Sequence, residues 1–308
     1  MKKRILFSLF SLVLTSLAAQ EKISETVTYH LPVKTIKLNS ETIAYVDEGS
    51  GEETLLFIHG LSSNLDSWKK NIAGLSSDYR CIAIDLPGYG KSSRSKTDYS
   101  LSEYADILNE MVEKMDLKNV VLAGHSMGGQ IAMHSVLKYP DTYKKLVLIA
   151  PAGIETFTAQ EATIMKASYT PAMVVGASDE QVLANYKMNF YSFPEDAQAM
   201  VDDRIAMKSA EDFQDYAETV VNNIHAMLEE PVIDEIGKIE VPVLMVFGKN
   251  DMLIPNKYFH PSESIASLVK TSEEKFNNIE VKTIDEAGHF VNFERSEKVN
   301  KEIRDFLK

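Results

Sequence analysis

Cysteine is almost absent from the sequence: Cys81 is the single cysteine among 308 residues. One thiol excludes an intramolecular disulfide, and it cannot supply a thiolate cluster for a metal ion. Cys81 stands inside an apolar run, where a packed core residue is the favoured interpretation over a nucleophile. No two histidines are four residues apart, as a helical metal site would require. The sequence therefore predicts neither a metal site nor a cofactor.

Basic residues are also scarce, with 32 lysines and arginines against 45 aspartates and glutamates, a formal net charge of −13 at pH 7. This balance gives no basic surface for nucleic acid, and an anionic membrane would repel the chain. Nucleotide motifs are incomplete. A phosphate loop ending at Gly90-Lys91-Ser92 would need glycine where Asp85 stands, and a dinucleotide motif starting at Gly88 has Ser93 in place of its third glycine. We expect a small-molecule partner and no nucleic acid.

Long apolar runs are missing beyond the first residues. The basic start at Lys2 to Arg4 is followed by the mostly apolar stretch Ile5 to Leu17 and by small residues, an order that predicts a cleaved signal peptide at residues 1–19. A retained anchor is the alternative, but serines and threonines interrupt the stretch, which falls short of the roughly 20 residues that span a bilayer. A lipid anchor would need a cysteine just after it. We expect an exported protein, periplasmic or secreted, with no stable membrane anchor.

Short β-rich runs then alternate with helical patterns. The segments 35–38 and 42–46 flank a turn at Asn39-Ser40 and predict a hairpin. Further runs are too short for helices and predict strands: Thr54–Ile58, Cys81–Ile84, Val120–Ala123, Leu146–Ile149, Val243–Phe247 and Ile279–Thr283. Apolar residues recur at helical spacing over 101–115, after a capping box of Ser100 and Glu103, and again over 296–307. This alternation predicts an α/β fold with a mostly parallel sheet.

The pattern changes after Pro151. Residues 153–236 have no comparable strand signal but contain helical stretches rich in methionine and aromatic residues. We predict a helical insert at 153–236 within an α/β core formed by 20–152 and 237–308. Such side chains can line an adaptable apolar pocket, although most of them should pack in the insert's own core. Arg204 is expected to be a solvated arginine, with contact to a substrate carboxylate as the alternative.

The pentapeptide Gly124-His125-Ser126-Met127-Gly128 lies between a predicted strand and a helical pattern at 130–139. A Gly-x-Ser-x-Gly sequence at such a junction is typical of a nucleophile elbow, a turn so tight that its flanking residues must be small. Chance would produce the pentapeptide in roughly one in ten chains of this length, and a glycine-rich turn with an incidental serine is the alternative. Its position after a strand and before a helix makes Ser126 the candidate nucleophile.

A serine nucleophile needs a base, and the base needs an orienting acid. Asp251 directly follows the strand predicted at 243–247, and His289 follows the strand predicted at 279–283. The carboxyl ends of parallel strands meet at one edge of the sheet, so we assign Asp251 as the acid and His289 as the base. Asp285 is the less favoured alternative acid. The less favoured bases are the other histidines: His30, His59, His125, His134, His225 and His260.

The developing oxyanion of an acyl transfer needs preorganised donors. We assign the backbone N–H of Met127, directly after the nucleophile, and the backbone N–H of Leu61, in the loop that follows the strand at 54–58. The alternative is that His59-Gly60 only ends that strand.

With the stretch Asp85 to Ser92, these motifs resemble the α/β-hydrolase superfamily, in the serine branch that includes bacterial carboxylesterases and meta-cleavage product hydrolases. The resemblance implies a mostly parallel sheet of about eight strands and a helical cap after the sixth. Haloalkane dehalogenases and epoxide hydrolases place aspartate at the elbow, so Ser126 implies acyl transfer. Glu294-Arg295-Ser296 departs from the family pattern, because the family often has a proline at the third of these positions.

Three functions remain open at this point. The favoured one is a serine hydrolase that cleaves a small, apolar carboxylic ester or lactone through an acyl-enzyme. The second is hydrolysis of a C–C bond in a vinylogous diketone, as in meta-cleavage hydrolases, which the expected export disfavours. The third is a non-catalytic ligand-binding protein on the same fold.

Overall fold

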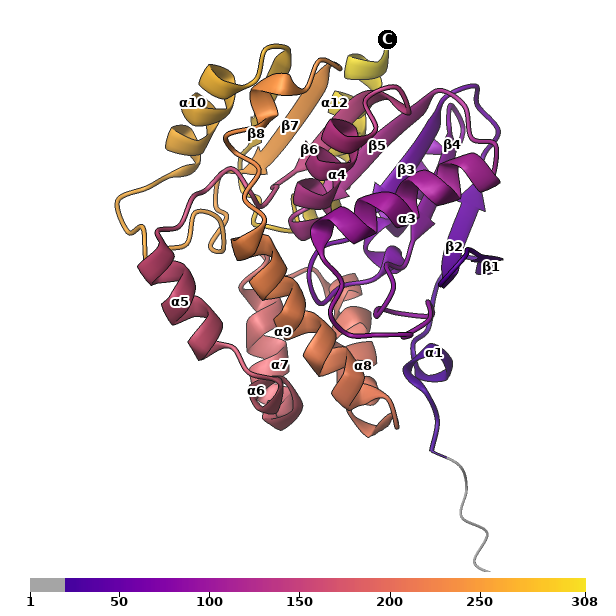
Figure 1. Cartoon of the computed structure of the whole chain (residues 1–308), viewed down its shortest axis with the longest axis vertical. Coiled ribbons are helices and arrows are strands. Elements are labelled where there is room, and N and C mark those ends of the chain that lie inside the picture. The colour runs from indigo at the N-terminus through magenta and orange to yellow at the C-terminus, as the bar shows by residue number, and fades with distance from the viewer. Residues whose placement is uncertain (1–19) are drawn as a thin grey trace, which may run out of the picture.

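The computed structural model describes residues 20–308, so the predicted signal peptide lies outside the described residues. One eight-stranded sheet runs through the molecule in the order β1-β2-β4-β3-β5-β6-β7-β8 (Figure 1). β1 pairs with β2 and β2 with β4 in antiparallel register, while every other pair is parallel. The predicted fold class is therefore confirmed. The strands are β1 Lys34–Lys37, β2 Thr42–Glu48, β3 Thr54–Ile58, β4 Arg80–Ile84, β5 Val120–His125, β6 Tyr143–Ile149, β7 Val243–Gly248 and β8 Ile279–Ile284.

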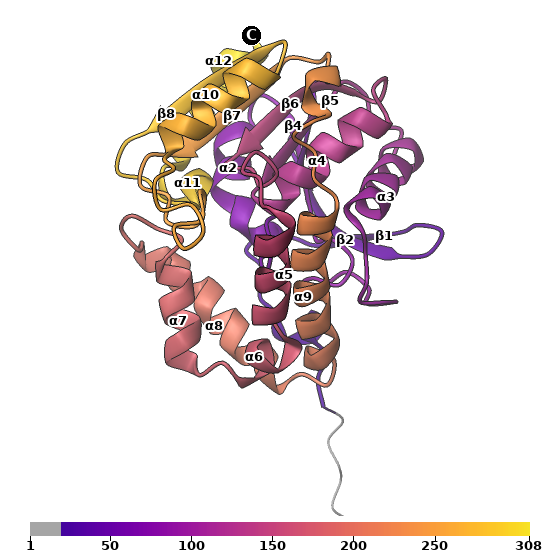
Figure 2. The same cartoon turned by 60° about the vertical axis from the view of Figure 1, so that its left-hand side comes forward.

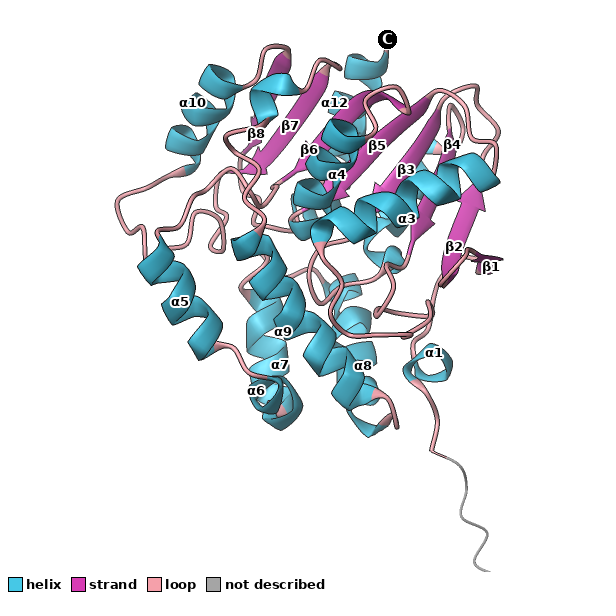
Figure 3. Ribbon diagram, viewed as in Figure 1, coloured by secondary structure: helices cyan, strands magenta, loops and turns pink. Residues whose placement is uncertain are grey.

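The central strands are apolar without interruption because helices cover both faces of the sheet. Successive side chains of a strand point to opposite faces. Leu56 and Leu122 thus pack on one face with α3 (Leu101–Lys114), α4 (Met127–Lys138) and α10 (Ile265–Lys275). Phe57 and Ala123 pack on the other face with α2 (Lys69–Leu75) and α12 (Ser296–Leu307). The coloured ribbon shows this layering (Figure 3).

Helix ends follow local signals in the sequence. The predicted capping box at the start of α3 is formed: the Ser100 side chain accepts from the N–H of Glu103, and the Glu103 side chain accepts from the N–H of Ser100. α4 ends two residues before Pro140, whose ring cannot continue a helix. No helix among residues 20–308 is long and apolar enough to cross a bilayer.

Between β6 and β7 the chain forms helices and no strand, and all of this stretch is described. The helices lie beyond the carboxyl ends of the central strands (Figure 2). We call residues 153–236 the helical insert; these limits remain a prediction. The helices of the insert are α5 Ala159–Ser168, α6 Pro171–Gly176, α7 Asp179–Lys187, α8 Gln198–Ala206 and α9 Phe213–Glu229.

Two short α-helices remain, in addition to 3₁₀ helices at Leu65–Trp68, Glu195–Ala197, Met207–Ser209 and Ile236–Lys238. α1 (Ile23–Thr26) contacts the helical insert, because the N–H of Ile23 donates to Asp212 Oδ1 at 2.8 Å. α11 (Val291–Glu294) follows β8 directly after the loop that carries His289.

Candidate active site

Ser126 stands at a sharp turn between β5 and α4, with φ of 53° and ψ of −118°. Its neighbours at 124 and 128 must be glycine: a Cβ on Gly124 would lie 2.2 Å from the Gly128 carbonyl oxygen, and a Cβ on Gly128 would lie 2.5 Å from the Ile58 carbonyl oxygen. Ser126 is also the single partly exposed residue in the otherwise buried stretch 120–133. The turn therefore presents this one hydroxyl at the sheet edge.

Asp251 and His289 are in direct contact. Nδ1 of His289 lies 2.7 Å from Oδ2 of Asp251, and each residue is 4% exposed. The second carboxylate oxygen, Oδ1 of Asp251, accepts the backbone N–H groups of Leu253 at 2.8 Å and Ile254 at 3.0 Å. These bonds fix the carboxylate plane. Because a carboxylate oxygen can only accept, the tautomer that fits this contact has its proton on Nδ1 and leaves Nε2 of His289 as the acceptor. Asp285, the rival acid, is an exposed residue paired with Lys249.

His125, next to Ser126 in the chain, contacts His289. Its ring lies 4.8 Å from the His289 ring, and its Nε2–H donates to the His289 carbonyl oxygen at 3.0 Å. Burial, together with the neighbouring His289, holds the pKa of His125 well below its usual range, so this ring stays neutral. Ser126 and His289 share no hydrogen bond within the described residues, and catalytic hydrogen bonds are often long in ligand-free enzymes. Because His125 precedes Ser126 and contacts His289, Ser126 and His289 lie at the same edge of the sheet, although they form no hydrogen bond with each other.

The loop after β3 lies against Ser126. A Cβ on Gly60 would stand 3.1 Å from Cβ of Ser126, so the backbone around Leu61 passes beside the serine. Met127 is the first residue of α4, where the N–H has no acceptor within the helix. Both assigned oxyanion donors therefore belong to segments that meet at Ser126.

His59 and Asp85 fix the shape of that loop. Nδ1–H of His59 donates to the Gly60 carbonyl oxygen at 2.8 Å, and Nε2 accepts the N–H of Leu86 at 3.1 Å. This arrangement requires a neutral ring, and burial lowers the pKa of His59 to about 4. Asp85 accepts the N–H of Leu65 at 2.8 Å, and burial raises the pKa of Asp85 to about 6. The loop is thus held at both ends by residues at the end of β4.

Glu294 makes contacts that the sequence alone did not reveal. Its Oε2 accepts the N–H of Gly288 at 2.8 Å and of Tyr191 at 3.1 Å, and its Oε1 accepts the N–H of Ser192 at 2.7 Å. One carboxylate therefore joins the loop of His289 to the helical insert. The family pattern marked an acidic residue at this position, but it carried no information about these partners.

The expected environment was wrong for Arg204 and right for Cys81. Arg204 was expected to be solvated, and this is wrong: the residue is 7% exposed, because α8 packs its side chain against the rings of Phe213 and Tyr216. Cys81 is buried as expected, and burial raises the pKa of its thiol to about 12. Within residues 20–308 no three histidine, cysteine, aspartate or glutamate side chains gather as metal ligands would.

The sequence of residues 53–296 matches the family model described as the alpha/beta hydrolase fold. The chain is 25% identical over 285 residues to the uncharacterized hydrolase YugF of Bacillus subtilis, covering 90% of this chain and 98% of the relative. A probable hydrolytic enzyme from Pseudomonas aeruginosa has the same fold, with a TM-score of 0.83, 22% identity and coverage of 94% and 98%. An esterase from Exiguobacterium antarcticum superposes with a TM-score of 0.74, 22% identity and coverage of 89% and 98%.

The chain therefore belongs to the α/β-hydrolase fold family. It is an enzyme of that type with hydrolase activity, which disfavours the non-catalytic binding protein among the three interpretations.

Proposed function

We propose that this hydrolase cleaves a carboxylic ester or lactone through an acyl-enzyme on Ser126. His289 acts as the base, and Asp251 is the carboxylate that orients His289. The observation that carries the proposal is the 2.7 Å contact between buried Asp251 and His289 at the sheet edge where Ser126 is presented. An imidazole held by a carboxylate in this way has one tautomer and one orientation, which is what a serine nucleophile requires.

In the first half-reaction the hydroxyl oxygen of Ser126 attacks the ester carbonyl carbon while Nε2 of His289 takes the hydroxyl proton. The carbonyl oxygen becomes an oxyanion that accepts the N–H groups of Leu61 and Met127. His289 then gives the proton to the leaving alcohol. Water attacks the acyl-enzyme in the second half-reaction, again with His289 as base, and releases the acid.

The helical insert acts in this proposal as a cap over the nucleophile. Glu294 supports it, because this carboxylate holds Tyr191 and Ser192 of the insert against the loop of His289. A cover of this kind keeps bulk solvent away from the oxyanion donors, still admits the water molecule that deacylates the enzyme, and limits the substrate to a small ester.

Turnover of 4-nitrophenyl esters of graded acyl length tests the proposal. Wild type should release nitrophenol with saturation kinetics, and Ser126→Ala should lower kcat by at least about a thousandfold. The exposed Ser262→Ala is the matched control and should retain full activity. A ring-fission product assayed in parallel tests the C–C reaction. Hydrolysis of that product alone, or ester turnover that survives Ser126→Ala, overturns the proposal.

Export to the periplasm or the medium is also a proposal. Cell fractionation and N-terminal sequencing of the recovered protein test it, with a first residue close to position 20 as the expected result. A cytoplasmic protein that retains residues 1–19 would contradict export.

A further inference from the structure

Arg204 is a buried cation without an anionic partner. It is 7% exposed, and its guanidinium makes no salt bridge or hydrogen bond to any of residues 20–308. Its Nη1 is fully withdrawn from solvent and unsatisfied. A buried charge is strongly unfavourable unless it is paired, and buried arginines are almost always paired. The unpaired guanidinium is therefore a candidate binding group for an anion.

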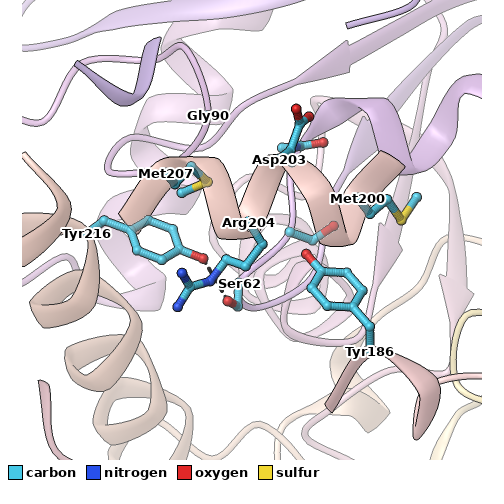
Figure 4. A pocket seen from close by; sticks show the side chains of 10 residues that line it. Ser62, Gly90, Tyr186, Met200, Asp203, Arg204, Met207 and Tyr216 are labelled. Carbon is cyan, nitrogen blue, oxygen red and sulfur yellow. Dashed lines mark hydrogen bonds between the residues drawn. The ribbon is translucent and has the colours of Figure 1, made fainter. Parts of the chain in front are cut away.

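Aromatic rings hold Arg204 in place without neutralising it. The guanidinium carbon lies 4.8 Å from the centroid of Phe213 and 5.1 Å from that of Tyr216. Stacking of this kind orients the planar group and leaves its N–H donors free for a bidentate acceptor. Figure 4 shows the side chain extending from α8 toward Tyr216 and Ser62.

The neighbouring carboxylates of the protein do not pair with Arg204, although Asp203 lines the same cavity. Asp203, the preceding residue, accepts the backbone N–H of Thr28. Asp212 pairs with Arg94 at 3.2 Å and accepts the N–H of Ile23. Neither of them supplies the counterion of Arg204.

The site lies close to the nucleophile. Arg204 lines a cavity with Ser62, and the Ser62 hydroxyl is 2.7 Å from the Tyr216 hydroxyl. Ser62 is two residues beyond Gly60, which borders Ser126, and two residues of chain span at most about 7 Å. The cavity and Ser126 therefore border opposite ends of the same short loop segment, residues 60–62.

The size of the cavity limits the group that it accepts. Its volume is about 10 Å³, room for about one water molecule. Met200 and Met207 also line it, and unbranched thioether side chains adjust easily to a new neighbour. A carboxylate is larger than one water molecule, so it enters only if these two side chains move, and a bulkier anion would require a larger movement.

We infer that Arg204 binds a carboxylate of the substrate, a few bonds from the carbonyl that Ser126 attacks. The inference rests on the proposed function and narrows its substrate class to monoesters of short dicarboxylic acids. A carboxylate and a guanidinium form two parallel charge-assisted hydrogen bonds, which explains an arginine rather than a lysine at this position.

Matched pairs of 4-nitrophenyl esters test the inference. The monoesters of succinic, glutaric and adipic acid are compared with the butanoate, pentanoate and hexanoate, which replace the carboxylate by methyl. Wild type should prefer at least one monoester over its neutral match by tenfold or more in kcat/KM. Arg204→Met should lower that preference by about tenfold to a hundredfold, mainly through a higher KM for the monoester.

Lys208→Met is the matched control, because Lys208 is a cation of the same insert that pairs with Asp179 at the surface. It should leave the preference unchanged. The inference is overturned if the wild-type enzyme has no higher kcat/KM for any monoester than for its neutral match. It is also overturned if Arg204→Met keeps the wild-type preference. Absence of turnover on both ester series contradicts the proposed function instead.

Binding to the full-length Ser126→Ala protein supplies a measurement that needs neither turnover nor an Arg204 variant. Calorimetric titration with glutarate and with pentanoate should give a Kd at least tenfold lower for glutarate. Equal binding of the two acids, or no binding of glutarate, overturns the inference even if Arg204→Met fails to fold.

Discussion

Glu294 accepts the backbone N–H of Gly288 at 2.8 Å, one residue before His289. The same carboxylate accepts N–H groups of Tyr191 and Ser192 from the helical insert. The N–H of Phe290, directly after His289, donates to the Asn189 carbonyl oxygen at 2.9 Å. His289 is therefore flanked on both sides by contacts to the insert, and its position depends on where the insert lies.

Glu294→Gln should weaken this connection, because an amide NH₂ would face a backbone N–H where the carboxylate had an acceptor. Leaving such a buried donor unsatisfied costs about 1–3 kcal/mol of unfolding free energy. We expect a lower Tm and a kcat reduced by about tenfold, with KM for a short ester nearly unchanged. Glu273→Gln, an exposed change in α10 without a hydrogen-bond partner, is the control. A Glu294→Gln enzyme with wild-type kcat would show that Glu294 does not position His289.

Gly128→Ala should separate the elbow from the oxyanion loop. The added Cβ would lie 2.5 Å from the Ile58 carbonyl oxygen and 2.6 Å from that of His59, and both are backbone atoms that cannot turn away. We expect loss of at least about 2 kcal/mol of stability and of most ester turnover. Gly176→Ala is the matched control, because nothing lies within 4 Å of its added Cβ. Denaturant unfolding and kcat/KM measure both effects, and equal behaviour of the two variants contradicts this account of the elbow.

His59 should make folding stability depend on pH. Burial lowers its pKa to about 4, from 6.5, so between these values the unfolded chain protonates His59 and the folded protein does not. The unfolded state then binds the extra proton, and stability falls as the pH drops from about 6.5 to about 4. The full effect is on the order of 3 kcal/mol, because one pKa unit corresponds to about 1.4 kcal/mol.

Comparison with His59→Asn isolates this effect. Asp85, whose pKa burial raises to about 6, opposes it by stabilising the folded state as the pH falls, but Asp85 is present in both proteins. The advantage of wild type over His59→Asn in unfolding free energy should therefore shrink toward pH 4. An advantage that stays constant from pH 7 to pH 4 would show that His59 is not held neutral by burial.

Local signals made much of the fold predictable. The strands, the capping box of Ser100 and the elbow around Ser126 depend on residues adjacent in sequence, and the structure has them where they were expected. The contact of Asp251 with His289 was predictable for a related reason. Parallel strands bring their carboxyl ends to one edge, so residues that directly follow β7 and β8 must lie near each other.

Residues whose roles depend on distant packing were not predictable. The burial of Arg204 follows from where α8 and α9 lie over the Ser62 loop, and no pattern around position 204 encodes that placement. An arginine on a short amphipathic helix is ordinarily solvated, so the sequence favoured the wrong environment. Glu294 has its partners on a loop far away in sequence, for the same reason.

Covalent labelling with a fluorophosphonate tests the central claim most directly, because it reports the activated serine without knowledge of the substrate. Peptide mapping by mass spectrometry should place a single adduct on Ser126 in the folded protein, and Ser126→Ala should take up no label. Correctly folded wild type that stays unlabelled, or that carries its adduct on another serine, would contradict the account.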